Sequence, residues 1–213
     1  MNDQFSLKQL FDLGGVFMWP LLVFSVATLG LLLERAVYIY FHDLSVKNLK
    51  VKLLELVKAR NFTAARSFLL GQSRRKSAAP ILLACLDSAS QGEHRMEKAV
   101  EAEAGERIRK LENGFNFLQA LASLAPLTGF LGTVSGMIGA FKSIANATEV
   151  NAQLVANGIY EALITTVFGL IIAIVAITGY NILAHAVDKF AGDLEKGASD
   201  LIAAVVTPQE EVK

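Results

Sequence analysis

The chain has 213 residues, of which 53% are hydrophobic and 19% are charged, and its 20 Lys and Arg balance its 20 Asp and Glu. A net charge of zero argues against a nucleic-acid-binding protein, because contact with a phosphate backbone requires a basic surface. The single cysteine, Cys85, excludes an internal disulfide framework. A composition this apolar directs attention to membrane-spanning segments.

After an N-terminal segment over residues 1–15, the first apolar segment predicts a transmembrane helix over residues 16–41. Residues 16–33 are apolar, Pro20 suits the first helical turn, and Glu34 with Arg35 marks the level where the helix leaves the lipid. A cleaved signal peptide is the alternative. The apolar core is too long for one, acidic residues precede it, and no small-residue cleavage pattern follows.

Residues 42–116 carry most of the cations of the chain and predict a helical loop on the cytoplasmic side. Within it, Asn61 is placed to cap one helix and Pro80 to open another. After Gly92, apolar residues recur at helical spacing with charged residues between them, which is typical of a solvated helix face. We find no decisive helix breaker before the second span and predict one continuous helix from the loop into the membrane.

Two further apolar segments predict transmembrane helices over residues 117–141 and 159–187, since about 20 apolar residues suffice to span the bilayer. The connector, residues 142–158, has few cations and is expected on the opposite side of the membrane from the loop. The C-terminal tail, residues 188–213, is expected in the cytoplasm, and the N-terminus on the same side as the connector. The predicted fold class is an all-α membrane protein with three transmembrane helices and a helical cytoplasmic domain.

Small residues gather on the faces of the second and third spans, where they would let helix backbones approach closely in lipid. The predicted packing residues are Pro126, Gly129, Gly132, Gly136, Gly169 and Ala173. Thr133, Thr165 and Thr166 add hydroxyls, which would either bond to their own helix carbonyls or line a polar path. If Lys142 and Glu161 share one level, Thr133 and Thr166 lie about 13 and 7 Å below it, one helical turn apart.

No pattern in the sequence favours an enzyme, a cofactor or a metal site. The three histidines are too far apart in sequence to match the ligand spacing of known metal sites. Cys85 has no base near it in sequence, and no phosphate-binding glycine loop follows a strand.

The segment from Ala125 to Ile138, APLTGFLGTVSGMI, and the segment from Gly158 to Leu170, GIYEALITTVFGL, resemble the MotA/TolQ/ExbB proton-channel family. Tyr180-Asn181 and the order and length of the first span and the loop agree with this family, and three spans rather than four favour its ExbB/TolQ branch. The resemblance implies an inner-membrane homopentamer around a central pore. It further implies that Thr133 and Thr166 face the pore and that Glu161 is the acid at its periplasmic entrance.

The resemblance also implies partners, namely ExbD/TolR-like single-span helices in the pore and a TonB/TolA-like protein that bridges to the outer membrane. The second and third spans hold no carboxylate deeper than Glu161, so the partner would supply the buried acid. One departure is Val175, which stands where relatives often have proline. For Glu161, the alternative is an ordinary helix-terminal acid favoured by the helix dipole.

Together with these observations, the resemblance implies a stator and channel subunit of a complex that uses the proton motive force to energise an outer-membrane or envelope process. Two alternatives stay open. The chain would instead be a cation channel that acts without a partner, or a structural scaffold that clusters membrane proteins through its glycine stripes and does not conduct.

Overall fold

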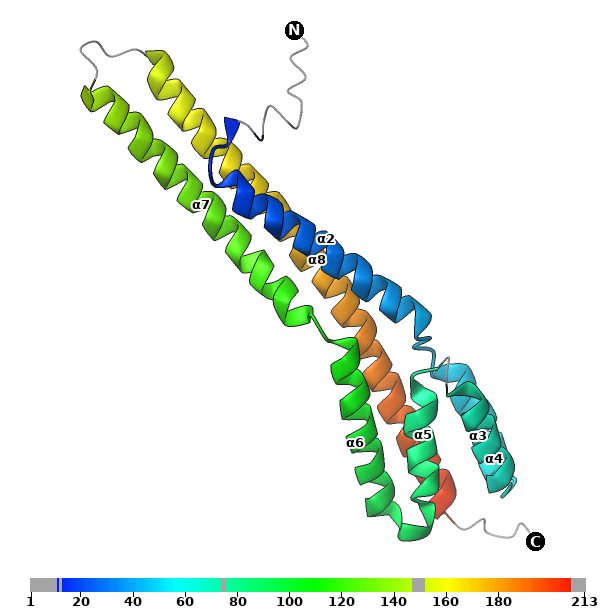
Figure 1. Cartoon of the computed structure of the whole chain (residues 1–213). Helices are drawn as coiled ribbons and strands as arrows, with labels where there is room; N and C mark the ends of the chain where they lie inside the picture. Colours follow the sequence, from blue (N-terminus) through cyan, green and yellow to red (C-terminus); the bar gives the residue numbers. More distant parts are fainter. Residues whose placement is uncertain (1–10, 12, 74–75, 147–151, 208–213) are drawn as a thin grey trace. The chain divides into compact units, whose positions relative to one another are not determined.

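The computed structural model describes residues 11, 13–73, 76–146 and 152–207 (Figure 1). Across these residues the regular structure is helical, apart from one isolated bridge between Asp43 and Lys76. The predicted all-α class is therefore confirmed for this part of the chain. The helices are α2 (Met18–Phe41), α3 (Lys47–Lys58), α4 (Phe62–Gln72), α5 (Ala78–Asp87), α6 (Glu93–Leu111), α7 (Phe115–Asn146) and α8 (Ala152–Val206), with a short 3-10 turn η1 (Ala89–Gln91).

The chain divides into two compact units. The first, here called the apolar unit, comprises Met1–Glu34 and Gly114–Asn181. The second, here called the polar unit, comprises Arg35–Asn113 and Ile182–Lys213. Helix α8 contributes to both, and each unit is described by itself.

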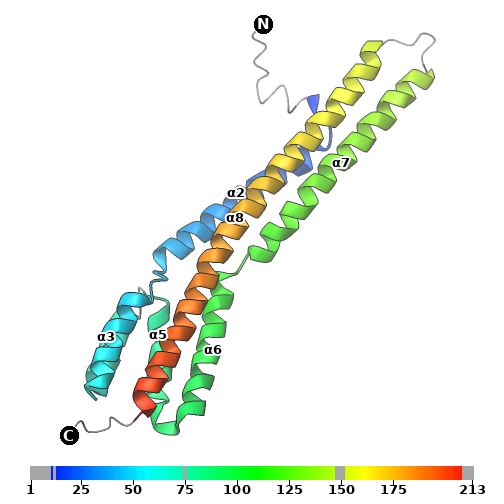
Figure 2. The same cartoon turned by 180° about the vertical axis from the view of Figure 1, so that it is seen from behind.

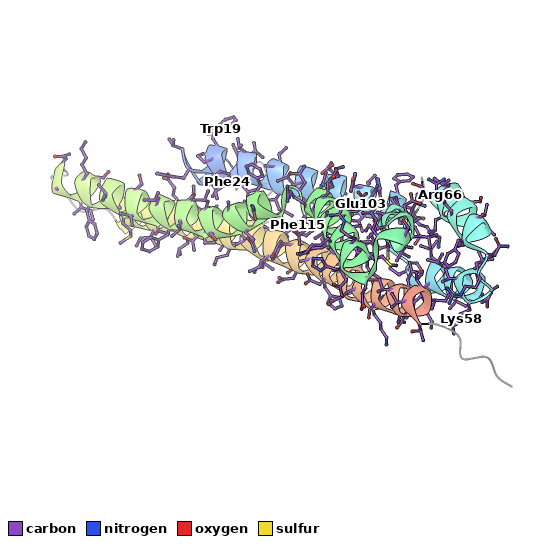
Figure 3. The ribbon with its side chains drawn as sticks, turned by 90° about the horizontal axis from the view of Figure 1, so that it is seen from below. Trp19, Phe24, Lys58, Arg66, Glu103 and Phe115 are labelled. Carbon is purple, nitrogen blue, oxygen red and sulfur yellow. The ribbon has the colours of Figure 1, made fainter. Side chains whose placement is uncertain are left out.

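In the apolar unit, α2 and α7 both lie beside α8 in two opposite views (Figures 1 and 2). Met18 and Leu21 of α2 pack with Ala125 of α7 and with Ile164 and Ile172 of α8. At the start of α7 the ring of Phe115, labelled in Figure 3, meets the ring of Tyr180 edge to face at a centroid distance of 5.6 Å. These contacts form the shared core of the three helices.

The outer faces of these three helices are apolar as well. Trp19 is 63% exposed on α2 and Phe130 is 63% exposed on α7. An apolar surface of this extent is typical of helices that face lipid. Within the described residues, three helical segments are long and apolar enough to cross a membrane, which confirms by length and composition that the chain has the three predicted apolar helices.

The polar unit is a helical bundle whose core consists of large apolar side chains, most of them leucines. In Figures 1 and 2, α5 lies between α6 and the α3–α4 pair. Asn61 caps α4 as predicted, because its Oδ1 accepts a hydrogen bond from the Ala64 amide at 3.0 Å. The fully buried side chains include Leu53 of α3, Leu69 of α4, Leu82 of α5, Met96 of α6 and Phe190 of α8.

The prediction of one continuous helix into the second span was wrong. Helix α6 ends at Leu111 and α7 begins at Phe115. Gly114 has φ of +85°, a left-handed conformation that glycine adopts without strain and that commonly terminates helices. Gly114, which follows the charged helix α6, therefore ends that helix, although the helical spacing of apolar residues continues across it.

The helices extend beyond the predicted spans. Helix α7 continues to Asn146, α8 starts at Ala152, and α8 runs on to Val206, through most of the predicted tail. With 55 residues at 1.5 Å each, α8 is about 80 Å long, so its ends cannot mark the edges of a bilayer. Residues 1–10, 12, 147–151 and 208–213 of the predicted termini and connector lie outside the described residues.

Candidate functional site

The contact between α7 and α8 depends on glycines that leave no room for a side chain. A Cβ built on Gly129 would lie 2.7 Å from the Thr165 carbonyl oxygen, and one on Gly169 would lie 2.5 Å from the Ala125 carbonyl oxygen. Both obstacles are backbone atoms, which cannot rotate away. The two helix backbones therefore approach to a distance that only glycine permits at these positions.

The same contact continues along both helices. Gly132 faces the Thr165 side chain, and a Cβ on Gly136 would lie 2.9 Å from the Gly158 carbonyl oxygen. Gly158 was not among the predicted packing residues, yet its own Cβ would come within 2.7 Å of the Ala140 methyl. The predicted connector, residues 142–158, includes Gly158, whereas in the structure this glycine lies within α8. Pro126 and Ala173 are half-buried.

These neighbours define the register of the two antiparallel helices. Gly136 lies opposite Ala162, Gly132 opposite Thr165, and Gly129 opposite Gly169. Because the helices are antiparallel, Thr133 and Thr166 follow Gly132 and Thr165 in opposite directions, so they lie about 3 Å apart along the helix axes, less than one helical turn. The predicted separation of one turn was wrong, because Lys142 and Glu161 are not level with each other.

The three threonine hydroxyls all have carbonyl partners within the chain. The Thr165 hydroxyl lies 2.8 Å from the Ala162 oxygen and 3.2 Å from the Gly129 oxygen. The Thr166 hydroxyl donates to the same Gly129 oxygen at 3.2 Å, and that of Thr133 donates to the Phe130 oxygen at 2.7 Å. A hydroxyl that donates inward still has lone pairs to offer as an acceptor.

Exposure separates the three threonines. Thr165 is 1% exposed and is enclosed between α7 and α8 of its own chain. Thr133 and Thr166 are half-buried, so part of each side chain reaches the surface of the helix pair. The structure thus brings two hydroxyls to one accessible level, while pore lining by any of the three stays a prediction.

Glu161 lies against a glycine turn that sequence reasoning did not connect with it. A Cβ on Gly15 would overlap the Glu161 carboxylate, lying 2.9 Å from its Cδ, and Gly15 has φ of +66°. The amide of Met18, the first residue of α2, donates to the Gly15 carbonyl at 3.2 Å. Since the amino end of a helix favours negative charge, this turn is a suitable neighbour for a carboxylate in an apolar surrounding.

The polar unit offers no alternative chemical centre in the part of the chain that the structure describes. No cluster of three His, Cys, Asp or Glu side chains forms there that could hold a metal ion. Burial raises the pKa of Cys85 to about 12, which keeps its thiol protonated and unreactive at neutral pH. The charges of α6 largely pair along the helix, for example Arg107 with Glu103 at 2.9 Å.

Residues 73–196, which run from the end of α4 to beyond all three threonines, match the sequence profile of the MotA/TolQ/ExbB proton channel family. This stretch is more than half of the chain. The chain belongs to the MotA/TolQ/ExbB proton channel family. As a member of this family of channel and transport proteins, it is a membrane protein, in agreement with its three apolar helices.

Individual relatives of this family member support the assignment. The Biopolymer transport protein exbB1 of Vibrio cholerae is 30% identical over 237 aligned residues, which cover 96% of each chain. The Putative biopolymer transport protein ExbB-like 1 of Synechocystis is 33% identical and covers 80% of this chain and 67% of its own. The Tol-Pal system protein TolQ of Haemophilus influenzae is 40% identical over 45% of this chain and 42% of its own.

Proposed function

We propose that the chain is the channel-forming stator subunit of an inner-membrane complex that uses the proton motive force to energise an envelope process. The observation that carries this proposal is the pair of half-buried threonines, Thr133 and Thr166, held at one level of a tightly packed α7–α8 pair. Hydroxyls at one level form a polar ring if several copies surround an axis.

In this proposal five copies surround the pore, and single-span partner helices of the ExbD/TolR kind occupy it. The sequence of α7 holds no carboxylate, and Glu161 is the one carboxylate in the part of α8 that belongs to the apolar unit. Threonine does not exchange protons in the range of biological pH, so the partner supplies the buried acid. A TonB/TolA-like protein then carries the work to the outer membrane.

The proposed topology keeps the sequence-based orientation. The amino terminus and the α7–α8 connector face the periplasm, and the polar unit faces the cytoplasm, because most cations lie between residues 42 and 116. The spans are proposed to lie within residues 16–41, 117–141 and 159–187. Single cysteines introduced in the connector or in α3 test this orientation. A reagent that cannot cross the membrane should label the connector cysteine and leave the α3 cysteine unlabelled.

The threonines provide the main test of conduction. Thr133→Val and Thr166→Val retain the side-chain volume and remove the hydroxyl, so the proposal expects intact assembly and reduced partner-dependent activity in a complementation assay. Thr178→Val is the matched control, since Thr178 is an exposed threonine elsewhere on α8. Full activity of both Thr133→Val and Thr166→Val would contradict pore lining.

Glu161 provides the second test. Glu161→Gln retains shape and most hydrogen bonding beside the Gly15 turn but removes the charge that would concentrate cations at a pore mouth. The expected result is an intact complex with reduced activity that partly recovers as the external pH falls. Unchanged activity at every pH would make Glu161 a helix-terminal residue, and loss of assembly would make it a structural one.

The two alternative functions predict different results. A channel that acts without a partner would conduct when the purified chain alone is reconstituted in vesicles. A scaffold would keep its activity in both threonine variants. The scaffold is disfavoured because Gly129, Gly132 and Gly169, which it would use to bind other proteins, already contact the opposite helix of the same chain.

The number of copies is tested by native mass spectrometry of the protein extracted in mild detergent. The proposal expects a homopentamer, since cyclic assembly around an axis is needed for a central pore. A stable monomer or dimer would remove the basis for that pore.

A further inference from the structure

The polar unit contains a small cavity whose wall is rich in positive charge. The cavity has a volume of about 350 Å³ and is lined by Arg35, Tyr38, Arg109, Lys110 and Asn113. Three of these five side chains are cations, and none is a carboxylate. Such a wall suits an anion, in particular one with several oxygens to accept hydrogen bonds.

Arg35 is held in place at the base of this cavity. It is only 7% exposed, and its Nη1 donates to the carbonyl oxygen of Lys110 at 3.1 Å. Its guanidinium carbon lies 4.8 Å from the centre of the Tyr38 ring. Contacts on two helices therefore hold the guanidinium in one orientation, and a planar guanidinium held in this way suits the geometry of a phosphate.

The other two cations differ in how they are engaged. Lys110 forms an ion pair with Glu106, so part of its charge is already balanced. Arg109 is exposed at the rim of the cavity. Arg109 is thus the side chain best suited to close on a ligand whose phosphate rests against Arg35.

The residues of the cavity border the apolar segments of the chain on both sides. Arg35 stands two positions after Leu33, the last residue of the first apolar run, and Asn113 stands two positions before Phe115, where α7 begins. Both residues therefore lie within two positions of an apolar segment. In a membrane-embedded chain this places the cavity at the depth of lipid headgroups, where tyrosine and arginine are favoured.

We propose that this cavity binds the phosphodiester of an anionic phospholipid, with Arg35 as its fixed donor and Arg109 as its closing one. Basic pockets beside membrane helices provide this kind of headgroup site. A lipid bound here would tie the second half of α2 to the end of α6, because Arg35 already joins the two through the Lys110 carbonyl. The proposal requires only that the chain is embedded in a membrane, and it is independent of conduction.

Native mass spectrometry of the full chain in mild detergent tests the proposal, with phosphatidylglycerol and phosphatidylcholine added in parallel. We expect preferential retention of phosphatidylglycerol, and Arg109→Gln should reduce that retention about fivefold, as removal of one cation near a lipid phosphate does. Arg95→Gln is the matched control, because Arg95 lies near the other end of α6 and contacts Gln91. The Arg95→Gln variant should retain as much phosphatidylglycerol as the unaltered protein.

Arg35→Gln should reduce retention at least as much, but it also removes the bond to Lys110, so Arg109→Gln decides the question. Equal retention of the two lipids, or an Arg109→Gln variant that retains phosphatidylglycerol as well as the control, would overturn the proposal. Displacement of the lipid by millimolar inorganic phosphate would overturn the lipid assignment in favour of a soluble phosphate ligand.

Discussion

The apolar unit and the polar unit each have a core, and the two cores are made of different kinds of contact. In the apolar unit, α7 and α8 meet through glycines whose missing side chains let one backbone touch the other, as at Gly129 and Gly169. In the polar unit the buried contacts are made by large side chains such as Leu53 and Leu82. The difference follows from the solvent, because burial of a leucine stabilises a fold in water and gains little when the alternative environment is lipid.

The comparison predicts that the two units respond to opposite kinds of substitution. The polar unit should be damaged by removing volume from its core, and the α7–α8 contact by adding volume. Four variants follow from the largest expected effect to the smallest; three have a matched control variant in the same unit, and Gly15→Ala is compared with the same change in a Glu161→Ala background. The common measurement is the melting temperature of the detergent-solubilised protein, with the free energy of unfolding where the transition is reversible.

Leu82→Ala should have the largest effect. Leu82 is fully buried in α5, and replacing such a leucine by alanine costs about 2–5 kcal/mol through lost burial and the cavity left behind. Leu70→Ala is the control, since Leu70 is 50% exposed on the neighbouring α4. If both variants melt at the same temperature, the polar unit does not depend on its core in the way the comparison requires.

Gly169→Ala adds one methyl group where the Ala125 carbonyl oxygen stands in the way. Overpacking of this kind costs about 1–3 kcal/mol, because one backbone must shift. Gly139→Ala on α7 is the control, since a Cβ there meets no atom within 4 Å, and alanine should be neutral or stabilising by up to about 1 kcal/mol. Equal melting temperatures would show that the glycine contact is not needed.

Gly15→Ala tests the close approach of the Glu161 carboxylate of α8 to the turn before α2. The positive φ of Gly15 costs a residue with a Cβ about 1–2 kcal/mol, and displacing the Glu161 carboxylate adds to that cost. In a Glu161→Ala background the second part disappears, so the two changes should be non-additive by at least about 0.5 kcal/mol. Strict additivity would mean that the side chain and the turn do not interact.

Asn61→Ala should have the smallest effect. It removes the cap of α4, in which Asn61 accepts from the Ala64 amide, and loss of such a cap costs about 1 kcal/mol. Asn48→Ala is the control, because Asn48 is exposed within α3, where alanine is a better helix former. A stability loss in Asn48→Ala as large as that in Asn61→Ala would contradict the capping role.

Much of the architecture could be predicted from the sequence because it depends on local patterns. A run of apolar residues long enough for a bilayer, as at residues 16–33, determines a spanning helix wherever the rest of the chain lies. The cap at Asn61 and the helix start after Gly92 are likewise set by neighbours a few residues away. Family membership also followed from residue order, because the threonine and glycine motifs are contiguous.

Only the tertiary structure decided what those local features contact. Periodicity could not show that Gly114 turns left-handed and ends the charged helix before α7, since a glycine in a helical pattern permits either outcome. Periodicity also could not give the register of α7 against α8, because that register depends on the pairing of particular glycines with particular carbonyl groups. The register brings Thr133 and Thr166 to nearly the same level and encloses Thr165. Nor could periodicity join Arg35 to Lys110, 75 residues away. Contacts between distant residues depend on the packing of whole helices, and that information is not present in any one segment of the chain.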